Sequence, residues 1–178
     1  MLSLARESIT HGLDTGSPLK VSSREFPAPL QAERACFVTL TQAGTLRGCI
    51  GHLEPVQSLV EDVAENAYSA AFRDPRFPAL QAAELGDTNI EISVLGPPRP
   101  IDFDSEQDLL QQIRPGVDGL ILQTPSGHRG TFLPSVWESL PEPSQFLAHL
   151  KLKAGVASDY WEDGVRVWRY ETEAFQED

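Results

Sequence analysis

The segment TLRGCIGHLEP, residues 45–55, places a cysteine between an arginine and a histidine. Cys49 is a soft nucleophile in its thiolate form, and Arg47, two residues earlier, could stabilise that thiolate. Gly48 and Gly51 could leave room for a substrate to approach the backbone. The same residues also suit a crowded strand, in which a buried cysteine packs as a small hydrophobic residue. The residues alone leave both interpretations open.

A thiol nucleophile needs a proton acceptor, and the histidines are the first candidates. His149 is taken here as the catalytic base, although its place near the end of a predicted helix also suits a solvated residue that favours the helix dipole. His52 lies three positions from Cys49, so on a regular strand it faces the opposite side, and it is assigned to substrate binding. His128 stays an alternative base.

A second group of polar residues could bind an anionic substrate between two lobes. Arg73 and Asp74 follow a predicted helix, and Arg129 and Thr131 follow a predicted turn. Guanidinium groups bind carboxylates and phosphates through two parallel hydrogen bonds. The alternative is an ion-pair network at the end of the helix, and Arg76 is interpreted as a structural member of that network.

The bulk properties exclude several classes of protein. The chain has 178 residues, a formal net charge of −12 and a pI near 4.7, so most of its surface repels nucleic acid. No apolar run is long enough to span a bilayer, and the N-terminus does not resemble a signal peptide. We therefore expect a cytoplasmic protein with no membrane or nucleic-acid partner.

Cofactor and metal sites also lack support in the sequence. No glycine-rich loop has the spacing of a nucleotide-binding motif. The two cysteines, Cys36 and Cys49, are too few for a disulfide scaffold and lack C-x-x-C spacing. His52 and Glu54 lie two residues apart, as metal ligands on a strand can, but no third ligand accompanies them. We expect neither a cofactor nor a metal.

The elements that must position Cys49 begin with a β-hairpin over residues 36–51. A three-residue loop, residues 42–44, would end in a glycine with left-handed backbone geometry. Because side chains alternate along a strand, this loop length places Phe37 opposite Cys49 and turns Cys36 to the other side. No disulfide is expected within the hairpin.

The remaining pattern predicts an α+β fold with a mostly antiparallel sheet flanked by helices. Apolar spacing predicts a helix that Ser58 and Glu61 cap. A second hairpin should turn at Pro125 and Gly127, and a later helix should be capped by Ser144. The predicted helices cover residues 3–13, 59–71, 105–113 and 144–155, and the other predicted strands lie within 88–95, 117–134 and 165–173.

Five motifs give the chain a resemblance to the AMMECR family, whose bacterial members are called AmmeMemoRadiSam system protein A. They occur in family order and span most of the chain between Cys36 and Trp168. The motifs are LRGCIG (46–51), AFRDPRF (71–77), DGL (118–120), RGTFLPSVW (129–137) and LKLKAG (150–155). The resemblance implies one α+β domain over residues 1–178, with a larger and a smaller lobe that meet near residues 46–52. The family name suggests Memo-like and radical S-adenosylmethionine proteins as partners.

Two classes of function follow from these observations. The first is an enzyme or enzyme subunit whose cleft holds Cys49 and which performs covalent thiol chemistry on a small or modified anionic substrate. The second is a noncatalytic interaction module that docks pathway partners through a groove between the lobes. A reactive thiolate at Cys49 would distinguish the first class from the second.

Overall fold

The structure is a computed structural model that describes residues 1–177. The chain divides into two compact units. The first unit contains Met1–Leu95 and a terminal segment that starts at Glu173, and the second contains Gly96–Thr172. Each unit is built on a four-stranded sheet. The predicted α+β class is confirmed, with two sheets in place of the single sheet that the pattern suggested.

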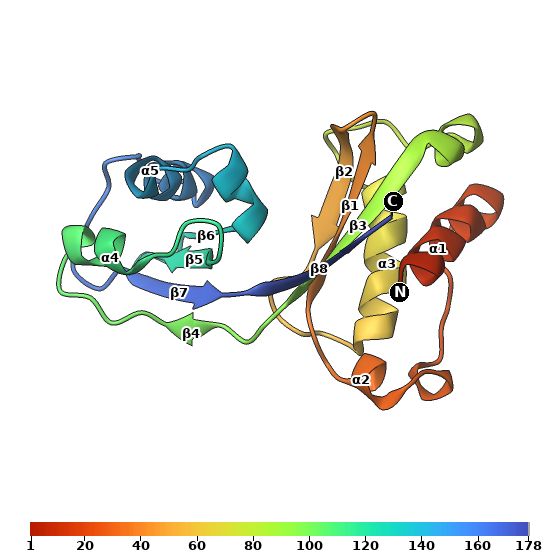
Figure 1. The fold of residues 1–178 in the computed structure, drawn as a ribbon, viewed down its shortest axis with the longest axis horizontal. Helices are drawn as coiled ribbons and strands as arrows, with labels where there is room; N and C mark the ends of the chain where they lie inside the picture. Colours follow the sequence, from red (N-terminus) through yellow and green to blue (C-terminus); the bar gives the residue numbers. More distant parts are fainter. Residues whose placement is uncertain (178) are drawn as a thin grey trace. The chain divides into compact units, whose positions relative to one another are not determined.

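In the first unit, two helices cover one face of the sheet. The strand order is β2-β1-β3-β8, and β1 pairs antiparallel with both β2 and β3. Figure 1 shows α3 running along these strands with α1 beside it. The elements are α1 (Leu2–Thr15), α2 (Ala28–Gln31), β1 (Cys36–Gln42), β2 (Thr45–Gly51), α3 (Leu59–Phe72), β3 (Thr88–Leu95) and β8 (Thr172–Gln176), with short 3-10 helices at Ser23–Glu25 and Ala82–Asp87.

Helix α3 starts and packs as its sequence predicts. Ser58 and Glu61 form the expected capping box, in which the backbone N–H of Ser58 donates to the Glu61 carboxylate at 3.3 Å. The apolar stripe of the helix faces the sheet. A Cβ atom built on Gly48 would lie 2.2 Å from the carbonyl oxygen of Ala70, so the helix approaches β2 as closely as a glycine allows. Gly48 is therefore explained by packing.

The first hairpin forms, but its predicted loop and register are wrong. The loop has two residues, Ala43 and Gly44, with φ values of 47° and 76°, and Ala43 accepts the left-handed geometry that the prediction reserved for glycine. A β-bulge shifts the register beside Leu40, which leaves Arg47 without a direct partner. As a result, Thr39 lies opposite Cys49. Phe37, which was predicted to lie opposite Cys49, lies opposite Gly51.

Cys36 lies on the helix-covered face of the hairpin, and it points away from the face of Cys49 as predicted. It is fully buried in the core of the first unit. Both cysteines carry free thiols. Burial and the nearby charge of Asp62 raise the pKa of the Cys36 thiol well above its ordinary value. Cys36 is therefore an unreactive core residue.

The second unit has its own sheet, with strand order β4-β7-β5-β6. The predicted second hairpin is confirmed, with its turn at Pro125 and a φ of 90° at Gly127. Helix α5 begins at Pro143 with Glu142 as its N-cap, so the predicted Ser144 cap is wrong; proline favours the first helical position. The elements are β4 (Arg99–Pro100), α4 (Glu106–Gln112), β5 (Gly119–Gln123), β6 (Arg129–Phe132), α5 (Pro143–Lys153) and β7 (Arg166–Tyr170), with a 3-10 helix at Pro134–Glu138.

A buried carboxylate organises the start of β5. Asp118 is fully buried and accepts the backbone N–H of Arg114 at 3.0 Å and its guanidinium at 2.6 and 3.0 Å. Arg169 of β7 donates to the same carboxylate at 3.3 Å. The indole N–H of Trp137 donates to the Asp118 carbonyl at 2.7 Å. The DGL motif thus has a structural explanation.

Candidate functional site at Cys49

Cys49 lies on the edge strand of the first sheet, with its side chain on the face that the helices leave uncovered. Its neighbours in sequence, Gly48 and Ile50, pack toward α3, so the alternation of the strand turns Cys49 the other way. The thiol is half-buried. Thr39, directly opposite, donates its hydroxyl hydrogen to Cys49 Sγ at 3.3 Å. A hydrogen bond of this kind is stronger when the sulfur is a thiolate.

The backbone of Cys49 is bound by an aspartate and an arginine that follow α3. The N–H of Cys49 donates to Asp74 Oδ2 at 2.9 Å, and the carbonyl accepts from Arg76 Nη2 at 3.3 Å. Arg76 also binds Asp74 through Nε at 2.9 Å and Nη2 at 2.7 Å. The two side chains thereby satisfy polar backbone groups that an edge strand otherwise exposes.

Asp74 and Arg76 each shift the pKa of the other. The Asp74 side chain is 2% exposed, and the hydrogen bonds from Arg76 hold the pKa of its carboxyl well below the ordinary value. The pKa of Arg76 is raised, chiefly by its hydrogen bonds to Asp74 and in smaller part by the charges of Asp74 and Cys49. The Arg76 side chain is nevertheless 53% exposed. The guanidinium of Arg76 is therefore fixed beside the Cys49 backbone as the exposed half of an ion pair with Asp74.

Arg47, the cation predicted to act on the thiol, has a different partner. Its Nε donates to Glu84 Oε1 at 2.9 Å and its Nη2 to Glu84 Oε2 at 3.1 Å. These bonds, with lesser contributions from neighbouring groups, lower the pKa of Glu84 to about 2. The bulge takes Arg47 out of the regular alternation, which explains why spacing along the strand misplaced it. The cation of the Cys49 site is Arg76.

His52 is directed to the helix-covered side of the sheet. Its Nδ1 lies 2.6 Å from Oδ1 of Asp62, a fully buried residue of α3, whose Oδ2 accepts the N–H of Cys36 at 2.9 Å. The predicted opposite orientations of His52 and Cys49 are thus confirmed. His149, the predicted base, lies on α5 in the second unit, whereas Cys49 belongs to the first.

Two further predicted site residues of the first unit have partners within the fold. The guanidinium carbon of Arg73 lies 4.9 Å from the centre of the Tyr68 ring. A Cβ atom built on Gly51 would lie 2.4 Å from the carbonyl oxygen of Cys36. The space above Gly51, like that above Gly48, is filled by the chain itself. This corrects the expectation that the two glycines leave room for a substrate.

The two predicted residues of the second unit lie on β6. Thr131 is buried, and its hydroxyl donates to the Leu120 carbonyl at 2.8 Å and lies 3.0 Å from the Tyr170 hydroxyl. Arg129 is exposed at the start of the strand. These contacts give Thr131 a structural role. A role in substrate binding stays a prediction for Arg129.

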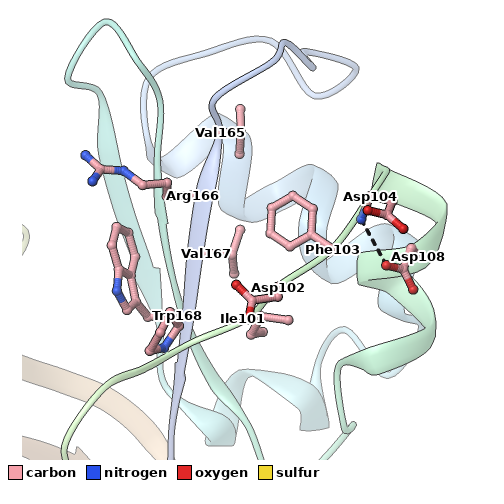
Figure 2. A pocket seen from close by; sticks show the side chains of 10 residues that line it. Ile101, Asp102, Phe103, Asp104, Asp108, Val165, Arg166, Val167 and Trp168 are labelled. Atoms are coloured by element: carbon pink, nitrogen blue, oxygen red, sulfur yellow. Dashed lines mark hydrogen bonds between the residues drawn. The ribbon is translucent and has the colours of Figure 1, made fainter.

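The second unit also has an open groove beside β7, with a volume of about 520 Å³. Figure 2 shows Phe103, Asp104 and Asp108 on one side of the strand and Arg166 and Trp168 on the other. Asp108 accepts the backbone N–H of Asp104 at 3.0 Å. No predicted site residue lines the groove, whose lining is Pro100, Ile101, Asp102, Phe103, Asp104, Asp108, Val165, Arg166, Val167 and Trp168.

Within residues 1–177, no cluster of three or more histidine, cysteine or acidic side chains is arranged to hold a metal ion. In the same range, none of the helices has both the length and the apolar character needed to cross a membrane.

Sequence reasoning missed Thr39, whereas its interpretation of Arg76 as a structural member of an ion-pair network is confirmed by the pairing with Asp74. The signal for Thr39 was its place on the partner strand, but the wrong loop length assigned that place to Phe37. The signal for Arg76 was its spacing of two residues from Asp74 across Pro75, because a turn there folds the arginine back onto the carboxylate.

Comparison with known proteins gives consistent matches over nearly the whole chain. The family model described as AMMECR1 matches residues 2–175. A protein of Methanothermobacter thermautotrophicus is 38% identical over 184 residues, which cover 100% of this chain and 93% of the relative. Protein MK0488 of Methanopyrus kandleri is 35% identical over 187 residues, with 100% and 87% covered. The crystal structure of protein PH0010 from Pyrococcus horikoshii is similar with a TM-score of 0.90 and 33% identity, over 99% of this chain and 89% of that one.

Proposed function

The chain belongs to the AMMECR1 family, and on that premise we propose that it acts as an enzyme or enzyme subunit through covalent chemistry at Cys49. Its substrate is a small molecule or modified residue that carries a negative charge. The observation that carries the proposal is the hydrogen bond from Thr39 Oγ1 to Cys49 Sγ, beside the guanidinium of Arg76.

Three properties of the site support a nucleophilic thiol. Thr39 supplies a donor whose bond strengthens as the sulfur becomes negative. Arg76 supplies a positive charge that its bonds to Asp74 hold in place. The N–H of Cys49 is fixed by Asp74, so the sulfur is presented from a defined backbone position. In the proposed reaction the Cys49 sulfur attacks as a thiolate, and the Thr39 hydroxyl donates its hydrogen bond to that thiolate.

A second candidate is a noncatalytic module that docks partner proteins. The observation in its favour is that the chain itself fills the space above Gly48 and Gly51, and that Arg47 is bound to Glu84. These contacts explain much of the RGCIG motif by packing alone. In that case the partners implied by the family name, Memo-like and radical S-adenosylmethionine proteins, would bind equally well to the wild type and to Cys49→Ser.

Alkylation kinetics test the thiol proposal directly. Cys36 is fully buried, so in the native protein iodoacetamide should modify Cys49 alone, and mass spectrometry locates the label. We expect native Cys49 to react faster than the same residue in the urea-unfolded chain. Thr39→Val should slow the native rate, whereas Thr39→Ser, which keeps the hydroxyl, should retain most of it. A native rate below the unfolded rate would exclude an activated thiol and favour the docking module.

A further inference from the structure

We infer that Arg76 forms a carboxylate-binding subsite of the Cys49 site. The site then selects electrophiles that carry a carboxylate close to the reacting atom. This inference rests on the proposed function, because it assigns the substrate class of the same thiol. Arg76 would thereby have a role in binding besides the structural role predicted from the sequence.

The donors of Arg76 are only partly used by the fold. A guanidinium has five N–H bonds. In Arg76, Nε and Nη2 bind Asp74, and Nη2 also binds the Cys49 carbonyl. Within residues 1–177, Nη1 makes no hydrogen bond, and the side chain is 53% exposed. One edge of the group is therefore fixed by Asp74, while the Nη1 end can donate to a ligand.

The bonds to Asp74 hold the Arg76 guanidinium in place, and the Nη1 end of the group stays exposed. A carboxylate on the substrate would bind the Nη1 end of the guanidinium, whose Nη2 donates to the Cys49 carbonyl, so the ligand would be held next to Cys49. Because Asp74 holds Nε and Nη2, little side-chain entropy is lost when the ligand binds. The geometry thus suits a small anion better than a neutral molecule of the same shape.

The charge of the whole chain makes such selection easy to detect. A formal net charge of −12 repels anions in general. An anionic reagent should therefore reach an ordinary thiol on this protein more slowly than its neutral analogue does. A preference for the anion at Cys49 would need a local positive charge that outweighs this repulsion.

The other two arginines near α3 and β2 differ from Arg76. Arg47 is 9% exposed and binds Glu84 through Nε and Nη2, and its unpartnered Nη1 is buried. Arg73 and Arg76 lie over the rings of Tyr68 and Phe77, and of these two arginines it is Arg76 that donates to the Cys49 backbone. Arg73 is only three residues from Arg76 and carries the same charge, which makes it the matched control.

Iodoacetate and iodoacetamide provide the test, since they differ only in the carboxylate. With either reagent the Cys49 thiolate attacks the methylene carbon, an S–C bond forms, and iodide leaves with the electron pair of the broken C–I bond. The measured quantity is the ratio of the two rate constants at low ionic strength, in the native protein and in the urea-unfolded chain. Using the ratio removes differences in thiolate population.

We expect the native ratio to exceed the unfolded ratio about fivefold, and added salt to reduce this excess. Arg76→Gln should abolish the excess, Arg76→Lys should keep part of it, and Arg73→Gln should leave it unchanged. The wild-type and salt measurements need no variant, so the test holds even where Arg76→Gln fails to fold.

The outcomes distinguish the two proposals. Fast labelling by iodoacetamide with no native excess for iodoacetate would overturn the anion subsite and leave the reactive thiol intact. The same conclusion would follow if Arg76→Gln kept the wild-type ratio. If neither reagent labels Cys49 before the protein unfolds, both proposals are overturned.

Discussion

Asp74 accepts the backbone N–H of Cys49 at 2.9 Å, on an edge of the sheet where another strand would normally donate and accept. Arg76 donates to the Cys49 carbonyl, as the N–H of a neighbouring strand would. A carboxylate and a guanidinium therefore imitate the C=O and N–H of a neighbouring strand. This arrangement protects the edge of β2 while its side chains stay accessible to chemistry.

The first prediction concerns this edge. Asp74→Asn should destabilise the protein by roughly 1–3 kcal/mol, because Arg76 loses its charged partner and a buried hydrogen-bonding group is left unsatisfied. The midpoint of urea unfolding measures the change. Asp104→Asn, an exposed residue of the second unit, is the control and should shift stability by less than about 0.5 kcal/mol. Equal midpoints for the two variants would contradict the role given to Asp74.

The second prediction compares two glycines. Gly48→Ala should cost about 1–3 kcal/mol or more, because the new Cβ would meet the backbone oxygen of Ala70 at 2.2 Å and no side chain can rotate away. Gly86→Ala places its Cβ in open space and should be nearly neutral. Thermal unfolding of the two variants checks this. A tolerated Gly48→Ala would mean that α3 can move away from β2 at little cost.

The third prediction concerns acid stability. Arg47 lowers the pKa of Glu84 from an ordinary value of 4.5 to about 2. Between these values the unfolded chain binds more protons at this group than the folded chain does, so stability rises with pH there. The contribution of Glu84 is fully present above pH 4.5 and is lost as the pH falls toward 2. Urea unfolding at several pH values should show a shallower slope in this window for Glu84→Gln.

A residual slope should remain in Glu84→Gln. Hydrogen bonds from Arg76 and Arg6 lower the pKa values of Asp74 and Glu177 in the same way. An identical slope in wild type and Glu84→Gln would show that the Arg47–Glu84 pair does not persist in solution.

The fourth prediction concerns the tautomer of His52. The carboxylate of Asp62 can only accept hydrogen bonds, so in the neutral imidazole the proton should sit on Nδ1, which lies 2.6 Å from Oδ1. Long-range ¹H–¹⁵N correlation spectra distinguish the two tautomers. Asp62→Asn should shift the population toward the Nε2–H form. A dominant Nε2–H form in the wild type would contradict the hydrogen bond.

Much of the fold could be predicted from local signals. Periodicity and caps identified α3 with its Ser58–Glu61 box, and turn residues identified both hairpins. The register of the first hairpin could not be predicted, because it depends on the positive φ of Ala43 and on a bulge beside Leu40. Alanine carries no signal for left-handed geometry, and the sequence around Leu40 carries no local signal for a bulge.

The candidate site could be predicted only where local signals were sufficient. Cys49 could be singled out by residue type, and the opposite orientation of His52 followed from alternation. Which arginine stands beside the thiol depends on contacts between distant segments. Glu84 lies 37 residues from Arg47 and Asp74 lies 25 residues from Cys49, and no local spacing records such pairs.

The terminal segment of the first unit bears on the order of folding during synthesis. Glu177 donates its N–H to the Ile90 carbonyl at 3.1 Å, and its carboxylate accepts the Ile90 N–H at 3.0 Å while pairing with Arg6. The unit that holds Cys49 is thus completed by residues made after the entire second unit. During synthesis the edge of β3 that pairs with β8 therefore stays open while about eighty further residues are made.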